Sequence, residues 1–146
     1  MLILRFQHRK PVFYTICTTL LLCSFGCSDG SDPIPELAEV TGTVTLDGAP
    51  LPGASIMFIP KMVNEKNKAR SSSGTTDAQG HYELMYNANA TGTIFGEHTV
   101  RISKTAGNPE DAGPETLPSK FNSKSTLSAN VTPDGEKEIN FDLKSK

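Results

Sequence analysis

The sequence predicts an all-β fold, an antiparallel seven-stranded sandwich of two sheets. Apolar and polar residues alternate with a period of two in six segments, which is the pattern of half-buried strands. No segment carries an apolar stripe with the 3.6-residue period of an amphipathic helix. Glycine, proline, asparagine and aspartate separate the segments, which favours turns over crossover helices as the connections.

Residues 1–26 have the organisation of a secretion signal. Three basic residues and no acidic residue precede an apolar stretch over 11–26. A membrane-spanning helix needs about 20 consecutive apolar residues, whereas threonine and serine interrupt this stretch and a polar segment follows it at once. We therefore expect the segment to be removed. Cleavage would make the chain more acidic than its net charge of -2, because all 16 acidic residues lie beyond it.

All three cysteines lie within the first 27 residues. The segment Leu22-Cys23-Ser24-Phe25-Gly26-Cys27 resembles the lipobox of bacterial lipoproteins, with Gly26 as the small residue before the modified cysteine. The resemblance implies lipid attachment at Cys27, export across the inner membrane, and anchoring at the periplasmic or cell-surface face of the cell envelope. Two or three acyl chains suffice for stable anchoring, since each buried methylene contributes about 0.8 kcal/mol. An ordinary secretory signal that is cut near Gly26 is the alternative.

Residues 27–39 are predicted to form a flexible linker, because their small, polar and proline residues offer too little apolar surface to fold. The sandwich domain is predicted over 40–146. Its strands, in order, cover residues 40–46, 54–59, 72–76, 81–86, 97–103, 127–131 and 139–143.

Turn residues mark the ends of the first three strands. Asp47-Gly48 follows the first strand, and Pro60, which cannot donate to a sheet ladder, ends the second. After the short third strand, the Asp77 carboxylate is expected to accept backbone N–H bonds across a turn in which Gly80 is left-handed. A calcium loop is the alternative for Asp77, but one carboxylate falls far short of the six to eight oxygens that calcium requires.

The last three strands close the domain. His98 falls on the inward phase of the fifth strand and is expected to be buried and hydrogen-bonded near a sheet end. Pro133-Asp134-Gly135 is predicted to be the tight connection of a C-terminal hairpin. The predicted core comprises Val40, Val44, Leu46, Ile56, Phe58, Tyr82, Leu84, Val100, Ile102, Leu127, Val131, Ile139, Phe141 and Leu143.

Turn and core motifs also carry a family resemblance. They are Val44-Thr45-Leu46-Asp47-Gly48-Ala49-Pro50-Leu51-Pro52-Gly53-Ala54, Phe58-Ile59-Pro60, Thr76-Asp77-Ala78-Gln79-Gly80-His81-Tyr82-Glu83-Leu84 and Gly96-Glu97-His98-Thr99-Val100-Arg101-Ile102. Over residues 40–143 the chain resembles the carboxypeptidase regulatory-like domain, a transthyretin-like sandwich. The closing residues are similar to the version found in short bacterial lipoproteins; they are Leu117-Pro118-Ser119-Lys120-Phe121-Asn122, Leu127 and Ile139-Asn140-Phe141-Asp142-Leu143. The resemblance implies a fold and says little of activity. Transthyretin-like hydrolases have a C-terminal Tyr-Arg-Gly-Ser, which this chain lacks, so no catalytic residue is carried over.

The candidate chemical groups are sparse. His81, on an outward phase, and His98 lie on different strands and do not show zinc-ligand spacing, so no metal or cofactor is expected. Ser71, Ser72 or Ser73 could be combined with His81 and Asp77 as a catalytic triad, but no nucleophile elbow surrounds them. Glu83 and Glu97 could form a carboxylate pair, although solvated strand faces are the simpler interpretation.

Two long loops of opposite charge are the candidate binding surfaces. The first carries Lys61, Lys66, Lys68 and Arg70, and the second, 105–119, carries Glu110, Asp111 and Glu115. The net charge of -2 gives no footprint for nucleic acid. The sequence therefore predicts a non-enzymatic, lipid-anchored cell-envelope protein whose domain is a structural or interaction module for an envelope protein or glycan. A carbohydrate- or peptide-binding module is the alternative, and an unrecognised hydrolase is a further one.

Overall fold

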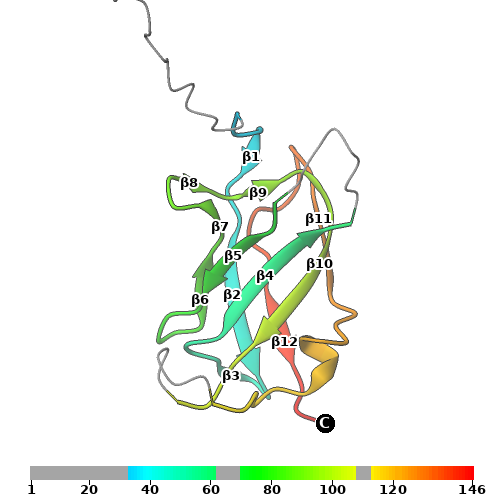
Figure 1. Cartoon of the computed structure of the whole chain (residues 1–146). Coiled ribbons are helices and arrows are strands. Elements are labelled where there is room, and N and C mark those ends of the chain that lie inside the picture. Colours follow the sequence, from blue (N-terminus) through cyan, green and yellow to red (C-terminus); the bar gives the residue numbers. More distant parts are fainter. Residues whose placement is uncertain (1–32, 62–69, 108–112) are drawn as a thin grey trace, which may run out of the picture. The chain divides into compact units, whose positions relative to one another are not determined.

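A computed structural model describes residues 33–61, 70–107 and 113–146 of the chain (Figure 1). Strands alternate with turns throughout these residues, and their one helical turn is the 3-10 helix η1 (Ser119–Phe121). The strands are β1 (Leu37–Ala38), β2 (Thr41–Leu46), β3 (Ala49–Pro50), β4 (Ser55–Pro60), β5 (Ser72–Thr75), β6 (His81–Glu83), β7 (Met85–Asn87), β8 (Ala90–Thr91), β9 (Thr93–Ile94), β10 (Gly96–Ser103), β11 (Ser128–Val131) and β12 (Phe141–Leu143).

The strands form two larger sheets and one small one. The first is six-stranded, in the order β11-β10-β4-β5-β7-β8, with antiparallel pairing throughout. In the second, four-stranded sheet, β2 pairs with β12 along one edge and with β3 and β6 along the other. The small sheet pairs β1 with β9.

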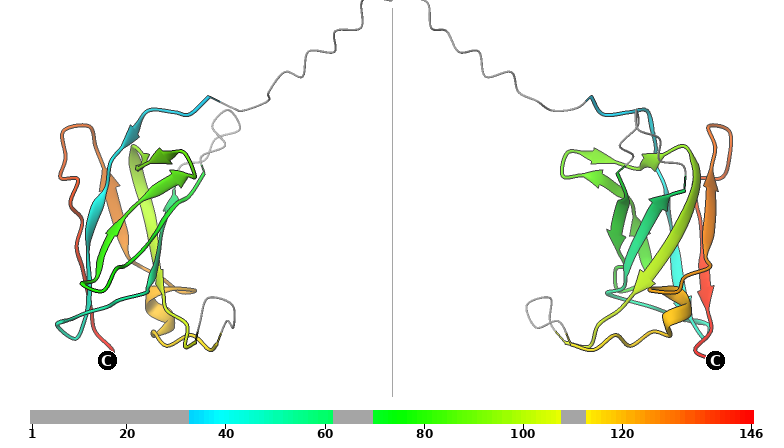
Figure 2. Two further views of the ribbon diagram at one scale, coloured as in Figure 1. Left: turned by 90° about the vertical axis from the view of Figure 1, so that its left-hand side faces the viewer. Right: turned by 45° about the vertical axis from the view of Figure 1, so that its right-hand side comes forward.

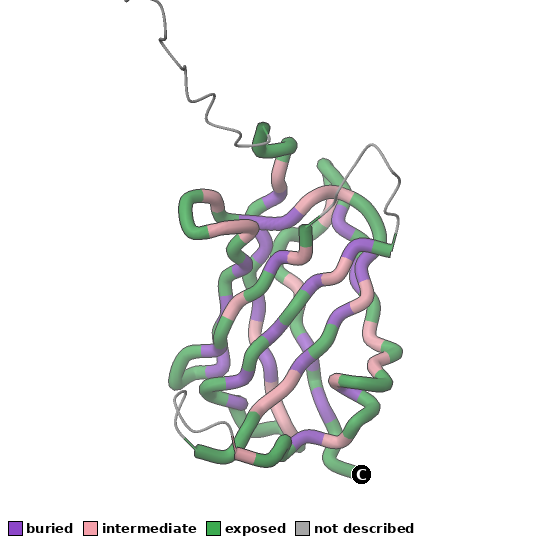
Figure 3. The backbone as a smooth tube through the Cα atoms, viewed as in Figure 1, coloured by how far each residue is buried: buried purple, intermediate pink, exposed green. Residues whose placement is uncertain are grey.

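The two larger sheets enclose one apolar core. Phe58 of β4 and Phe141 of β12 come from different sheets and meet edge to face, with ring centroids 6.2 Å apart. Figure 2 shows β2 and β12 on one side of the molecule and β4 and β10 on the other. Burial alternates along the strands (Figure 3), as the period-two pattern requires. The buried apolar residues are Ala38, Val40, Val44, Leu51, Ala54, Ile56, Phe58, Tyr82, Leu84, Val100, Ile102, Leu117, Phe121, Ala129, Val131, Phe141 and Leu143.

The mostly-β, antiparallel character that the sequence predicts is confirmed. Each predicted strand segment contains an observed strand, to which the structure adds the two-residue strands β1, β3, β8 and β9. Leu46, Leu127 and Ile139 of the predicted core are only partly buried, and every other member of that core is buried.

The fourth predicted strand, 81–86, is two strands in different sheets. β6 pairs with β2, whereas β7 pairs with β5 of the other sheet. Leu84 lies between them, is fully buried, and donates its N–H to the Val40 carbonyl at 3.0 Å. A single alternating segment can thus serve both sheets, because a change of sheet at one residue leaves the alternation on either side unchanged.

The predicted C-terminal hairpin is wrong. β11 pairs with β10 in one sheet, and β12 pairs with β2 in the other. The turn itself is present, because Gly135 N–H donates to the Thr132 carbonyl at 3.2 Å, but it carries the chain from one sheet to the other. The β2–β12 pairing is parallel, which the period-two pattern did not indicate.

Gly42 permits this parallel approach. The segment before β12 is bound to β2 by the N–H of Thr41, which donates to Lys137 at 2.9 Å, and by the N–H of Ile139, which donates to Thr41 at 2.8 Å. A Cβ at position 42 would lie 1.9 Å from the Ile139 carbonyl oxygen and 2.9 Å from the Tyr82 ring. Only glycine therefore fits between the two segments.

The N-terminal end of the folded unit lies within the segment expected to be linker. The compact unit comprises residues 34–146, and β1 pairs with β9 in the register Leu37 with Ile94 and Ala38 with Thr93. Ala38 is buried in the core. Residues 1–32, which include the predicted signal and Cys27, lie outside the described residues.

Candidate functional site

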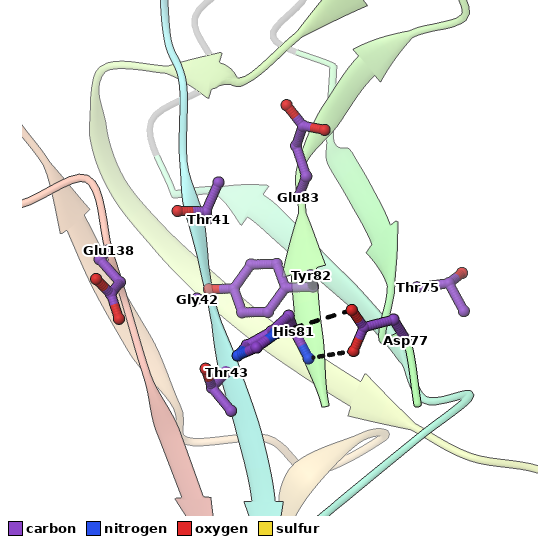
Figure 4. Close-up of a pocket in the computed structure, with 9 residues that line it drawn as sticks. All are labelled: Thr41, Gly42, Thr43, Thr75, Asp77, His81, Tyr82, Glu83 and Glu138. Carbon is purple, nitrogen blue, oxygen red and sulfur yellow. Dashed lines mark hydrogen bonds and ion pairs between the residues drawn. The ribbon is translucent and has the colours of Figure 1, made fainter. Parts of the chain in front are cut away.

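A polar depression of about 360 Å³ lies over β2 and β6 and reaches the segment that precedes β12 (Figure 4). Residues on β2 and β6 contribute most of its lining, and the end of β5, the following turn and the C-terminal segment complete it. The lining residues are Thr41, Gly42, Thr43, Thr75, Asp77, His81, Tyr82, Glu83 and Glu138.

The turn that holds Asp77 and His81 forms one wall. Asp77 Oδ1 accepts hydrogen bonds from the backbone N–H groups of Gln79 at 2.8 Å and His81 at 2.9 Å. These two bonds hold the pKa of Asp77 below its ordinary value of 3.8, and the bond from the His81 N–H has the larger effect. Gly80 has a φ of 80°, so the predicted turn is confirmed in both respects. The turn places Asp77 Oδ2 3.7 Å from His81 Nδ1, where the carboxylate can pair with a protonated imidazole.

Cross-strand pairing sets the opposite wall. Thr43 of β2 lies opposite His81, and Thr41 lies opposite Glu83. The parallel C-terminal segment places Glu138 beside Thr41. Threonine, acidic and histidine residues from three parts of the chain therefore line the depression (Figure 4).

Tyr82 and Gly42 form the buried part of the lining. The Tyr82 hydroxyl donates to the Ile139 carbonyl at 2.7 Å, and its ring lies over Gly42. Burial raises the pKa of the Tyr82 phenol well above its ordinary value of 10.0. Tyr82 is therefore a neutral hydrogen-bond donor that ties β6 to the C-terminal segment.

The serines do not join His81 and Asp77 in a triad. None of Ser71, Ser72 and Ser73 lines the depression. Ser72 is fully buried in β5, where its Oγ has no hydrogen-bond partner among the described residues. Without a serine beside the imidazole, this pair lacks the nucleophile that a triad requires.

Glu83 and Glu97 do not form a carboxylate pair either. They lie on β6 and β10, which belong to different sheets. Glu97 instead lies 3.6 Å from Lys61 in an exposed ion pair. The solvated-face interpretation therefore holds for Glu97. Glu83 lines the depression, and Glu97 does not.

His98 is buried and hydrogen-bonded at a sheet end, as predicted. Its side chain has no exposed surface, and its ring centroid lies 5.7 Å from that of Phe58. Its ring nitrogens contact Gly96 and Thr93, and burial lowers its pKa below 6.5. It does not line the depression.

Both candidate loops are described only in part. Residues 62–69, with Lys66 and Lys68, and residues 108–112, with Glu110 and Asp111, lie outside the described residues. At the base of the second loop, Glu115 Oε1 accepts from the N–H groups of Lys104 and Leu117, both at 2.9 Å. Glu115 thus stabilises the loop base.

The sequence analysis names Asp77, His81 and Glu83 as candidates. Of the other polar residues in the lining, Thr41 and Thr43 were within reach of sequence reasoning and Glu138 was not. The outward phase of Thr41 and Thr43 is visible in the alternation of their strand, although neither was singled out. Glu138 joins the depression only because of the parallel pairing with β2.

Within residues 33–61, 70–107 and 113–146, no helix is long and apolar enough to cross a membrane. The same residues contain no cluster of three or more histidine, cysteine or acidic side chains that could hold a metal ion. Comparisons of the chain with protein-family models, with curated proteins and with solved structures give no match.

Proposed function

We propose that the protein is a non-enzymatic component of a bacterial cell envelope. Its domain serves as a structural or interaction module, of transthyretin-like, carboxypeptidase regulatory-like fold, on a lipid tether at Cys27. The polar depression over β2 and β6 carries the interaction role, because its groups are suited to binding.

Solvent exposure favours binding over catalysis at this depression. The side chains of His81 and Asp77 are 63% and 52% exposed. In water the field of a carboxylate is strongly screened, so it activates an imidazole weakly compared with a desolvated pair. Asp77 is also engaged by two backbone N–H groups, which gives it a structural role in the turn.

Binding of a carbohydrate or peptide at the depression is the more specific candidate. Thr41, Thr43 and Glu138 offer hydroxyl and carboxylate groups side by side, and these exchange hydrogen bonds with sugar hydroxyls or peptide amides. His81 adds a ring nitrogen, Nε2, which accepts a hydrogen bond when Nδ1 carries the proton toward Asp77.

Partner capture tests the interaction role. The tagged full chain would be mixed with envelope extract and compared with H81Q and E138Q, which alter the depression, and with E136Q. Glu136 makes a matched control, since it is an exposed glutamate on the same segment and does not line the depression. We expect wild type and E136Q to capture the same partner and H81Q and E138Q to capture less. Equal capture by all four chains would contradict a role for the depression.

Thermal stability tests the carbohydrate or peptide candidate separately. A glycan or peptide that binds the folded chain raises its melting temperature by mass action. No shift with a broad panel of envelope glycans and peptides would count against this candidate.

Mass spectrometry tests the tether. We expect the mature N-terminal peptide to begin at Cys27 and to carry acyl chains, and we expect Cys27→Ala to abolish both the modification and membrane retention. An unmodified Cys27 in the mature protein would refute the lipid anchor.

A further inference from the structure

His98 belongs to a buried polar network outside the depression. Its imidazole and the Thr93 side chain are fully buried at the end of β10, where β9 enters. His98 Nδ1 lies 3.0 Å from the Gly96 carbonyl oxygen, and Nε2 lies 3.3 Å from Thr93 Oγ1.

These partners define the neutral form of the ring. A carbonyl only accepts, so Nδ1 carries the proton and donates to Gly96. Nε2 is then the acceptor, and the Thr93 hydroxyl donates to it. The network therefore uses both nitrogens of an uncharged imidazole.

The network spans a bend in the backbone. Thr93 belongs to β9 and His98 to β10, and Gly96 between them has a φ of 121°. The imidazole thus connects residues on both sides of the bend. β9 is in turn the strand with which β1 pairs, through Leu37 with Ile94 and Ala38 with Thr93.

The surroundings of His98 offer a second proton little compensation. Its cross-strand neighbours are Pro60 of β4 and Ala129 of β11, and the Phe58 ring packs against it. Glu97 and Lys61, the charged residues next to it on β10 and after β4, pair with each other at the exposed surface. Among the described residues, no ion pair includes His98, and burial outweighs the opposing effect of the Gly96 carbonyl on its pKa.

We propose that the Thr93–His98–Gly96 network is an acid-sensitive latch that holds β9, and β1 paired with it, on the domain. At neutral pH the uncharged imidazole closes the bend. On acidification the imidazole gains a proton when this end of the domain opens, and opening is favoured. β1 lies near the end of the segment expected to form the linker, so opening would lengthen the tether; only this last consequence depends on the proposed function.

The direction and size of the effect follow from proton linkage. In the open state His98 has the ordinary pKa of 6.5, and in the closed state its pKa is lower. The latch therefore stabilises the closed state fully above pH 6.5, and this stabilisation is lost as the pH falls below 6.5. At pH 5.5 opening is favoured by up to about tenfold, since one pH unit below the open-state pKa corresponds to one factor of ten.

Hydrogen exchange of the full chain at pH 7.5 and pH 5.5, corrected for intrinsic exchange rates, tests the latch. We expect those amides of β1 and β9 that donate across the Leu37–Ile94 and Ala38–Thr93 pairing to lose up to about tenfold in protection at pH 5.5. The amides of Phe58 and Val100 should keep a higher protection at both pH values, which marks the opening as local. The proposal would be overturned if β1 and β9 were equally protected at pH 7.5 and pH 5.5. It would also be overturned if β1 and β9 were as strongly protected as the core amides.

Three variants assign the effect to His98. H98Q should lose the pH response, whereas H81Q, which removes the exposed histidine, should keep it. T93V removes the hydroxyl that meets Nε2 with little change of volume, and it should lower the protection of β1 and β9 at pH 7.5. If H98Q does not fold, T93V and the wild-type pH response still decide: protection in T93V equal to that of wild type would overturn the proposal.

Discussion

The parallel pairing of β2 with the C-terminal segment makes Gly42→Ala the most informative substitution in the fold. The added Cβ would lie 1.9 Å from the Ile139 carbonyl oxygen and 2.9 Å from Tyr82 Cε1, and Cβ contacts below 3.0 Å are essentially never seen. Both obstacles are held in place, since one is backbone and the other is a buried ring. The C-terminal segment must therefore move away from β2.

The expected loss of stability can be worked out from the bonds at this position. The movement strains the hydrogen bonds from Thr41 to Lys137, from Ile139 to Thr41 and from Tyr82 to Ile139, which measure 2.9, 2.8 and 2.7 Å. Each contributes about 1 kcal/mol, and overpacking itself costs about 1–3 kcal/mol. Because the bonds are weakened rather than all lost, we expect the free energy of unfolding to fall by about 2–4 kcal/mol.

Urea denaturation of the full chain measures this loss, and Gly53→Ala is the matched control. Gly53 has a φ of 65°, and its added Cβ would have no atom within 4 Å. This control therefore incurs only backbone strain of about 1 kcal/mol. If G42A is no less stable than G53A, the steric argument for the parallel pairing is refuted.

Three other perturbations test the remaining contacts. Tyr82→Phe removes the donor to the Ile139 carbonyl and should lower the free energy of unfolding by about 1–2 kcal/mol in urea; an unchanged midpoint would contradict the role of the hydroxyl. Thr76→Val should cost about 2–4 kcal/mol, because buried Thr76 Oγ1 donates to Leu51 at 2.6 Å and accepts from Ala54 at 2.8 Å. Thr76→Ser keeps the hydroxyl and should recover most of that loss, and a loss in Thr76→Ser as large as that in Thr76→Val would contradict the assignment of the cost to the hydroxyl. Asp77 and Asp47 have pKa values below 3.8, owing to the hydrogen bonds from His81 and Ser145. The stability that these two ionised carboxylates add to the folded state should be complete above pH 3.8 and lost below it. Asp77→Asn should therefore flatten the acid side of a stability–pH curve.

Local pattern gave reliable predictions for the strands and for most of the core. Alternation correctly predicts that Ile56, Phe58, Val100 and Ile102 are buried, because successive side chains of a strand point to opposite faces. Turn chemistry was equally local: Asp77 reaches its two N–H partners within four residues. His98 was predicted to be buried for the same reason, since its phase matches that of its apolar neighbours.

Strand pairing was harder to predict. The C-terminal hairpin was wrong because Asp134-Gly135 makes a turn without specifying which strand the chain joins next. β1 was missed because two residues are too few to show a period. Part of the candidate site was hidden for a related reason, since Glu138 reaches it through a pairing between residues 97 positions apart.

The sequence by itself determined where the longer strands lie, which of their faces are buried, where the Asp77 turn lies, and that His81 points outward and His98 inward. Each of these follows from interactions between residues close in the chain. Only the tertiary structure decided that β12 lies parallel to β2, that residues 81–87 serve two sheets, and that Thr41, His81 and Glu138 share one depression. The physical reason is that partner choice depends on space between distant segments. The missing side chain of Gly42 provides that space, and alternation along the chain does not record it.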